Sequence, residues 1–146
     1  MNPVLKPLAL LGRFLLALIF VDAGFRKLGA ISAVAANMDK HGIPHADMLV
    51  WGVIALELGG GLALMAGFLA RLVALLFFFY LIALVVLFHP YWTFPAGEAA
   101  AQRTEFFGHL SMMGGMLLVV AFGAGPYSID RLIFGRRADA LPQAAE

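Results

Sequence analysis

The sequence contains no cysteine, and only 13% of its 146 residues are charged. Without cysteine the chain has no disulfide, no thiolate nucleophile and no thiolate-ligated cluster, so redox chemistry would need a bound cofactor or substrate. Soluble domains carry about 25% charged residues, and a short chain with far fewer cannot cover its surface with polar side chains. The net charge of +1 also provides no basic surface for nucleic acid. A soluble fold and a nucleic-acid partner are therefore disfavoured.

What the sequence has instead is long apolar segments. Hydrophobic residues make up 62% of the chain, and the mean hydropathy is +0.91. A helix needs about 20 mostly apolar residues to cross the hydrocarbon layer of a bilayer. Four segments meet this requirement, at residues 8–25, 49–68, 72–88 and 106–122. We therefore predict an all-α fold, a four-helix integral membrane bundle over residues 1–134, followed by a short polar tail over 135–146.

The spacing of the four segments predicts their connections. Only a few residues separate the second and third segments, and Gly67 can end the second helix there, so we expect a tight antiparallel hairpin. The connections at 26–48 and 89–105 are longer and fall on the opposite side. Positively charged residues favour the cytoplasmic side of a membrane. Those on the side of the short turn are Lys6, Arg71, Arg131, Arg136 and Arg137, against Arg26, Lys27, Lys40 and Arg103 on the other. This bias predicts that both termini are cytoplasmic.

Small residues recur every four positions in the second segment, at Ala55, Gly59, Ala63 and Gly67. Lipid gives helices no hydrophobic reason to associate, so close backbone contacts at small residues stabilise membrane bundles. We expect this stripe to be where the second helix meets a neighbour.

Glu57 lies near the middle of the second apolar segment, where a charge costs about 2.5–3.5 kcal/mol on insertion scales. It must find a cation or take up a proton. Arg13 is the natural partner if the first two helices are antiparallel neighbours. Two interpretations follow: a buried Arg13–Glu57 pair that only fixes the bundle, or a polar pocket that binds a substrate headgroup or relays a proton.

The first helix carries three further charges. Asp22 and Arg26 are four residues apart, acid before base, so they can form a local ion pair. Lys27 falls on the same helical face as Arg13. These positions predict that both faces of the first helix contact other polar groups.

The fourth segment begins with Glu105 and His109, which are four residues apart and share a face with Met112. A histidine–methionine face can bind haem or copper, but a single helical histidine is more often a hydrogen-bonded interior residue. The other histidines, His41, His45 and His89, fall in predicted connections and form no HxxxH pattern. We therefore predict no metal site. The predicted polar pocket consists of Arg13, Lys27, Glu57, Glu105 and His109.

Short motifs follow one another in a fixed order along the chain. They are Leu11-Gly12-Arg13, Ala23-Gly24-Phe25-Arg26-Lys27-Leu28, His41-Gly42-Ile43-Pro44, Glu57-Leu58-Gly59-Gly60-Gly61, Gly67-Phe68-Leu69-Ala70-Arg71 and Gly123-Ala124-Gly125-Pro126-Tyr127-Ser128-Ile129-Asp130. Their order and spacing over residues 8–130 resemble the DoxX family of small four-helix bacterial membrane proteins. The resemblance implies a bundle in the bacterial inner membrane. It also implies a redox role, because the related DoxD proteins are subunits of a thiosulfate:quinone oxidoreductase. The family often has lysine or asparagine where this chain has His109, so the resemblance implies no role for that residue.

Three functions remain open from the sequence. The preferred one is a component of a membrane redox system that binds quinone or another apolar substrate, with Arg13, Glu57 and His109 as candidate catalytic residues. Electrons would then come from a soluble or membrane redox subunit, or from the substrate itself. The second is a non-catalytic scaffold or assembly subunit, as a homo-oligomer or with a partner, in which buried charges specify helix register. The third is a small carrier of an apolar molecule. The residues alone imply no cofactor, and whether the protein is an enzyme stays open.

Overall fold

The computed structural model describes residues 5–138, and within these residues it contains helices and no strand. The elements are α1 (Leu5–Leu28), α2 (Ile31–Lys40), α3 (Ala46–Ile54), the π-helical η1 (Ala55–Gly60), α4 (Gly61–Ala66), α5 (Ala70–Phe88), the 3-10 turn η2 (Tyr91–Thr93), α6 (Ala96–Phe122) and α7 (Ile129–Ala138). Four spans are long and apolar enough to cross a membrane: α1, the continuous α3–η1–α4 helix, α5 and α6. The predicted all-α four-helix membrane bundle is confirmed.

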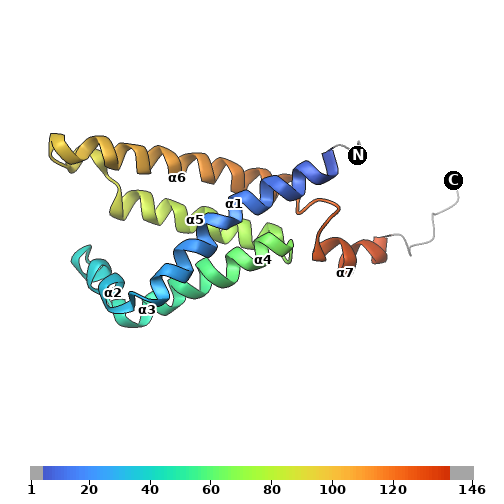
Figure 1. Cartoon of the computed structure of the whole chain (residues 1–146), viewed down its shortest axis with the longest axis horizontal. Helices are drawn as coiled ribbons and strands as arrows, with labels where there is room; N and C mark the ends of the chain where they lie inside the picture. The colour runs from blue at the N-terminus through green and yellow to red at the C-terminus, as the bar shows by residue number, and fades with distance from the viewer. Residues whose placement is uncertain (1–4, 139–146) are drawn as a thin grey trace, which may run out of the picture.

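The four spans form two halves (Figure 1). α1 packs on η1 and α4 in one half, and α5 packs on α6 in the other. Leucine and phenylalanine side chains such as Leu62, Phe79 and Phe122 remain exposed on the outward faces of the spans, as expected of helices that contact lipid. The short turn after α4 has Gly67 in the left-handed conformation, with φ of +70°, as predicted for the hairpin.

Two separate hydrophobic clusters hold the bundle together. The larger lies where the halves cross and includes Phe20 and Phe77, whose ring centroids are 4.1 Å apart. The smaller lies between α2 and α3 and is built around Val50 and Ile54. The halves are therefore joined tightly at their crossing point, while α2 and α3 form a local unit of their own.

The predicted connections contain more helix than expected. Residues 26–48 include α2, a ten-residue helix too short and too polar to register as a membrane span. α6 begins at Ala96, ten residues before the predicted start, because its first turns are polar and only its later turns are apolar. Its 27 residues extend about 40 Å, longer than the hydrocarbon layer of about 30 Å. α7 runs past the boundary predicted at residue 134, and residues 139–146 of the predicted tail lie outside the described residues.

The predicted small-residue stripe is wrong for the second span. A Cβ placed on Gly59 would meet nothing within 4 Å, whereas one on Gly61 would lie 2.8 Å from Val21 Cγ2. One on Gly24 of α1 would lie 2.7 Å from the backbone nitrogen of Leu58. The reason is η1: a π-helical turn holds more residues than an α-helical one, so positions four apart no longer share a face.

Candidate functional site

Arg13 does not pair with Glu57, so the predicted Arg13–Glu57 pair is wrong. Only 3% of Arg13 is exposed, and its guanidinium donates hydrogen bonds to the backbone carbonyl oxygens of Ala124, Met65 (3.2 Å) and Tyr127 (2.8 Å). These carbonyls lie in the last turn of α4 and in the segment after α6, where backbone oxygens lack helical partners. Arg13 of α1 is therefore tied to the end of α4 and to the segment after α6, and within residues 5–138 it forms no ion pair.

Gly67 makes this approach of Arg13 possible. A Cβ on Gly67 would lie 2.9 Å from the guanidinium carbon of Arg13 and 2.5 Å from Cβ of Ser128. Real Cβ atoms essentially never come so close, and the φ of +70° is one that side chains rarely adopt. Glycine is thus required here both for the turn and for the space that Arg13 occupies.

Asp130, at the start of α7, closes the same end of the bundle. Its carboxylate accepts hydrogen bonds from the backbone N–H groups of Leu69 (2.7 Å) and Ala70 (2.9 Å), at the start of α5. A carboxylate in this position satisfies unpaired donors and complements the positive end of the helix dipole. We refer to this group of residues as the Arg13 end: Arg13, Gly67, Ala124, Ser128 and Asp130.

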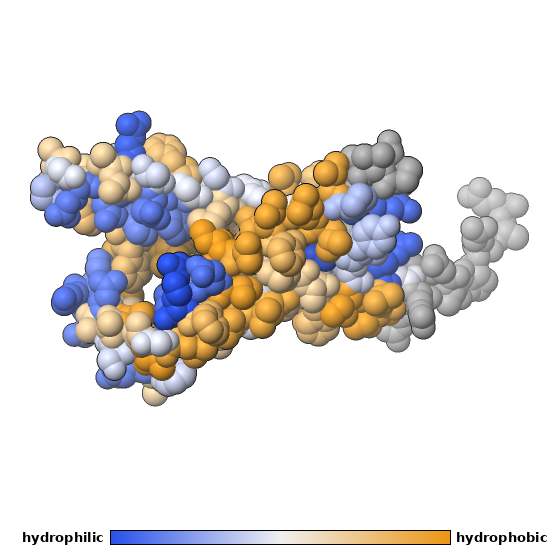
Figure 2. All heavy atoms as spheres, viewed as in Figure 1, coloured by the Kyte–Doolittle hydropathy of each residue, from blue (hydrophilic) through white to orange (hydrophobic). Residues whose placement is uncertain are grey.

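At the opposite end, the two halves diverge around a cavity of about 640 Å³. This volume falls within the range of about 300–1,000 Å³ that is usual for small-molecule sites. Most of its walls are apolar and come from all four spans and α2, with Phe20, Val53, Leu84 and Met112 among the lining residues. Figure 2 shows the notch at this end, between two groups of polar side chains. We call the cavity and its lining residues the cavity end.

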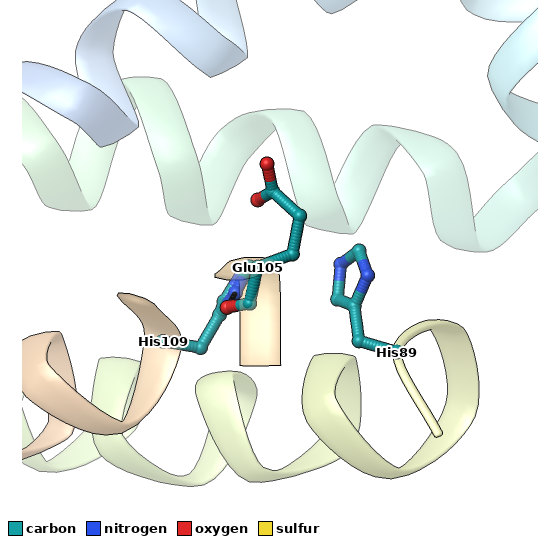
Figure 3. Close-up of side chains that lie close together, drawn as sticks. All are labelled: His89, Glu105 and His109. Atoms are coloured by element: carbon teal, nitrogen blue, oxygen red, sulfur yellow. Dashed lines mark hydrogen bonds between the residues drawn. The ribbon is translucent and has the colours of Figure 1, made fainter. Parts of the chain in front are cut away.

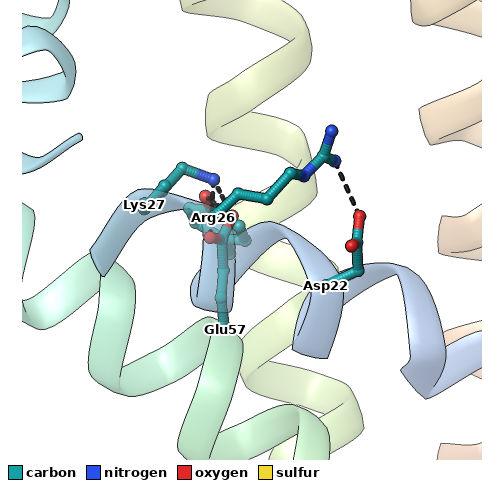
Figure 4. A network of polar contacts seen from close by, with 5 residues as sticks. Asp22, Arg26, Lys27 and Glu57 are labelled. Carbon is teal, nitrogen blue, oxygen red and sulfur yellow. Dashed lines mark hydrogen bonds and ion pairs between the residues drawn. The ribbon is translucent and has the colours of Figure 1, made fainter. Parts of the chain in front are cut away.

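A buried carboxylate lies in the wall of this cavity. Glu57 is 3% exposed, and Lys27 Nζ lies 2.8 Å and 2.6 Å from its two oxygens (Figure 4). The Tyr80 hydroxyl donates a third hydrogen bond to Glu57 Oε1 at 2.6 Å. Gly24 lets the backbones of α1 and η1 touch, which brings Lys27, one turn further along α1, within reach. The charge of Glu57 is therefore paired by Lys27, the residue predicted to share a face with Arg13.

The other ion pair of α1 lies on the surface. A guanidinium nitrogen of Arg26 lies 2.8 Å from Oδ2 of Asp22, which confirms the predicted local pair. Both side chains are mostly exposed. An exposed pair of this kind contributes about 0.3–0.5 kcal/mol, so it does little to hold the bundle together.

Two histidines and a glutamate meet at the rim of the cavity (Figure 3). The rings of His89, which follows α5, and His109 of α6 have centroids 4.9 Å apart. One ligand atom from each ring and one from Glu105 all lie within 4.8 Å of one another. The sequence pattern did not predict that His89 approaches His109. The two rings are brought together by the hairpin between α5 and α6. No local sequence pattern links them.

Four of the five residues of the predicted pocket line this one cavity: Lys27, Glu57, Glu105 and His109. Arg13 lies at the other end of the bundle. Sequence reasoning missed Tyr80 and His89. Tyr80 is the only hydroxyl-bearing residue in an otherwise apolar third span, which is the one signal that could have pointed to it.

The sequence comparisons agree with this fold. The DoxX family model matches residues 8–90, more than half of the chain. The chain is 36% identical over 124 residues to the inner membrane protein YqjF of Escherichia coli K12, covering 85% of this chain and 90% of that protein. This chain belongs to the DoxX family. It is also 28% identical to the inner membrane protein YphA of the same organism, over 85% of this chain and 89% of YphA. No solved structure matches the chain.

The match to the DoxX family model divides the candidate residues into two groups. Arg13, Lys27, Glu57 and His89 lie inside the matched residues 8–90, whereas Glu105 and His109 lie beyond them. The short motifs that resemble DoxX proteins fall at both ends of the bundle. The Gly67 turn and the segment 123–130 build the Arg13 end, and the motifs that contain Lys27 and Glu57 build the cavity end.

Proposed function

We propose that this DoxX protein binds a quinone, or a similar apolar molecule with a polar head, in the cavity, and acts as a component of a membrane redox system. The observation that carries the proposal is a largely apolar cavity of about 640 Å³ with one buried, hydrogen-bonded charge cluster in its wall. Small-molecule sites combine apolar walls with a few polar groups that fix orientation.

The charge cluster suits a quinone headgroup. Lys27 has three N–H donors and directs two contacts at Glu57. It makes no other hydrogen bond within residues 5–138, so a third donor is available for a quinone carbonyl oxygen. Reduction of a quinone to a quinol takes up two electrons and two protons. The two protons would come from water, with Glu57 as the carboxylate that takes up a proton and passes it to the headgroup while Tyr80 orients it through a hydrogen bond of 2.6 Å. The electrons would come from a partner subunit or a reduced substrate.

We also propose that the protein resides in the inner membrane with its Arg13 end and both termini in the cytoplasm. The names of YqjF and YphA support the location. Lys6, Arg71 and Arg131 lie toward the Arg13 end, which supports the orientation by the positive-inside rule. Since the chain has no cysteine, single cysteines placed at either end can be labelled with membrane-impermeant maleimide in intact cells. Labelling of a cysteine at the Arg13 end would contradict the proposed orientation and support the opposite one.

Ligand extraction tests the binding proposal. The full chain is purified in mild detergent, and bound quinone is measured by mass spectrometry per mole of protein. We expect the wild type to retain quinone in a ratio near one, and to regain it when stripped and supplied with a short-chain ubiquinone. Glu57→Gln and Tyr80→Phe should lower that ratio, since each alters the polar wall of the cavity.

The matched control is Asp22→Asn, which removes a carboxylate from an exposed pair on α1 and should leave the quinone ratio unchanged. Thermal melts show that each variant is folded. If the stripped wild type takes up no quinone, or if Glu57→Gln lowers only stability and binds quinone as the wild type does, the proposed pocket is wrong. A non-catalytic scaffold would then be the better description.

A further inference from the structure

The histidine and carboxylate group at the rim of the cavity has the composition of a metal site. His89, Glu105 and His109 offer two imidazole nitrogens and one carboxylate oxygen, all within 4.8 Å of one another. Ligand atoms around one zinc ion lie about 3–3.5 Å apart, because Zn–N and Zn–O bonds are about 2.0–2.2 Å long. Small torsional changes of side chains at the cavity rim would therefore bring the three atoms to bonding distance.

The hydrogen bonds of the two rings orient them as ligands. Nδ1 of His109 lies 2.7 Å from the backbone carbonyl oxygen of Glu105, and Nδ1 of His89 lies 2.8 Å from Oε1 of Gln102. A backbone carbonyl oxygen only accepts, so Nδ1 of His109 carries the proton and its Nε2 keeps a lone pair. The side-chain oxygen of Gln102 favours the same tautomer for His89. No hydrogen bond in the described residues 5–138 engages either Nε2. Metal-bound histidines almost always have this second-shell arrangement.

Glu105 supplies the third donor. It lies one turn before His109 on the same face of α6, is exposed, and forms no ion pair within the part of the chain that the structure describes. A carboxylate without a cation partner therefore lies beside two rings with free nitrogen lone pairs. Together they offer three ligands, and a water molecule could supply a fourth. Each of the three residues also lines the cavity.

We infer that His89, Glu105 and His109 bind a divalent transition-metal ion of the zinc type. Imidazole and carboxylate ligands select such borderline ions, and two histidines with one glutamate form a ligand set found in zinc sites with an open coordination position. The open position would face the cavity, where water or a polar oxygen of the cavity's occupant could bind. This inference does not rest on the proposed quinone function, since the three ligands are independent of Glu57 and Lys27.

Metal titration of the full chain tests the inference. The protein carries a tag without histidine, is stripped with chelator in detergent, and is titrated with Co²⁺, whose visible absorption reports ligand number and geometry. Bound zinc is measured separately by mass spectrometry after dialysis. We expect one equivalent of either ion per wild-type chain. His89→Gln and His109→Gln should each weaken binding by more than 100-fold, since a ligand counts for more than an outer-shell partner, whose loss costs about 10–100-fold.

Three further variants sharpen the test. Gln102→Leu removes only the partner of His89 Nδ1 and should weaken binding by about 10–100-fold. His45→Asn removes an exposed histidine outside the group and should change nothing; asparagine tolerates the left-handed φ of 54° found there. If a histidine variant fails to fold, Glu105→Gln takes its place as the variant that removes a ligand. Glu105 is exposed, so its replacement should not disturb the fold. The inference is overturned if the wild type binds no more Co²⁺ than the His89→Gln/His109→Gln double variant, whatever the outcome of the quinone assay.

Discussion

The two ends of the bundle each bury a charged side chain, and they do so in different ways. At the Arg13 end, the guanidinium donates to the backbone carbonyls of Ala124, Met65 and Tyr127. At the cavity end, Glu57 is held by two side chains, Lys27 and Tyr80. Backbone partners are fixed by the fold, whereas side-chain partners can turn, release and exchange protons. The first arrangement suits a structural tie and the second a binding site.

This difference refines a common expectation about membrane proteins. A charge inside a membrane span is a functional candidate by default, since it is costly to bury. Arg13 and Glu57 are equally buried, each 3% exposed, so burial does not distinguish them. A cavity also reaches each of them, of about 640 Å³ at Glu57 and about 400 Å³ at Arg13. What distinguishes them is the kind of partner: side chains hold Glu57, and backbone carbonyls hold Arg13.

The largest effect should come from Gly67→Ala at the Arg13 end. Alanine would have to adopt the left-handed backbone conformation that glycine has there, and its Cβ would displace Arg13 from its carbonyl partners. The two costs together should lower the free energy of unfolding by about 4 kcal/mol, measured by SDS titration in mixed micelles. Gly114→Ala is the control, since a Cβ there would meet nothing within 4 Å. A Gly67→Ala protein that stays as stable as Gly114→Ala would remove the structural role assigned to the Arg13 end.

The sequence predicted the four spans because each is a nearly uninterrupted apolar segment, and it predicted the Gly67 turn because glycine ends helices. It could not predict the partners of Arg13, since these are backbone carbonyls whose positions depend on where α4 and α6 end. α2 was missed because a short amphipathic helix gives no span signal. His89 and His109 could have been paired from the sequence, because His89 follows the predicted third span and His109 lies near the start of the fourth, so both fall on the same side of the membrane.

Removing one member of the Lys27–Glu57 pair should have the next largest effect. Lys27→Met leaves Glu57 buried without its cation, and Glu57→Gln leaves Lys27 facing a neutral amide. Each should lower the free energy of unfolding by about 3 kcal/mol, at the low end of the range for buried pairs because 26% of the Lys27 side chain is exposed.

The double variant Lys27→Met/Glu57→Gln separates structure from binding at the cavity end. It should recover at least half of the lost stability, because no unpaired charge remains buried. Bound quinone should not return with it. A double variant that regains both stability and quinone would show that the cavity end, like the Arg13 end, uses its charges only for structure.

A smaller effect is expected from Asp130→Ala at the Arg13 end. The change removes the acceptor for two backbone N–H groups at the start of α5, and loss of such a cap costs about 1 kcal/mol. Asp22→Ala, in the exposed pair with Arg26, should cost only a few tenths of a kcal/mol in the same SDS titration. Equal losses in the two variants would mean that Asp130 does not act as a helix cap.

An effect on stability smaller than that of Asp130→Ala should come from His41→Leu at the cavity end. The ring of His41 lies against Phe88, with centroids 4.4 Å apart, and this contact joins the end of α2 to the end of α5. Its loss should cost about 0.5 kcal/mol. Because α2 contributes Val34 and Met38 to the cavity wall, we expect bound quinone to dissociate faster, as measured by displacement with excess ligand. His45→Asn serves as the control for an exposed histidine. An unchanged dissociation rate would show that the contact between His41 and Phe88 does not control release of the ligand. The cavity wall formed by α2 would then be as fixed as the Arg13 end, and the ligand would leave by another route.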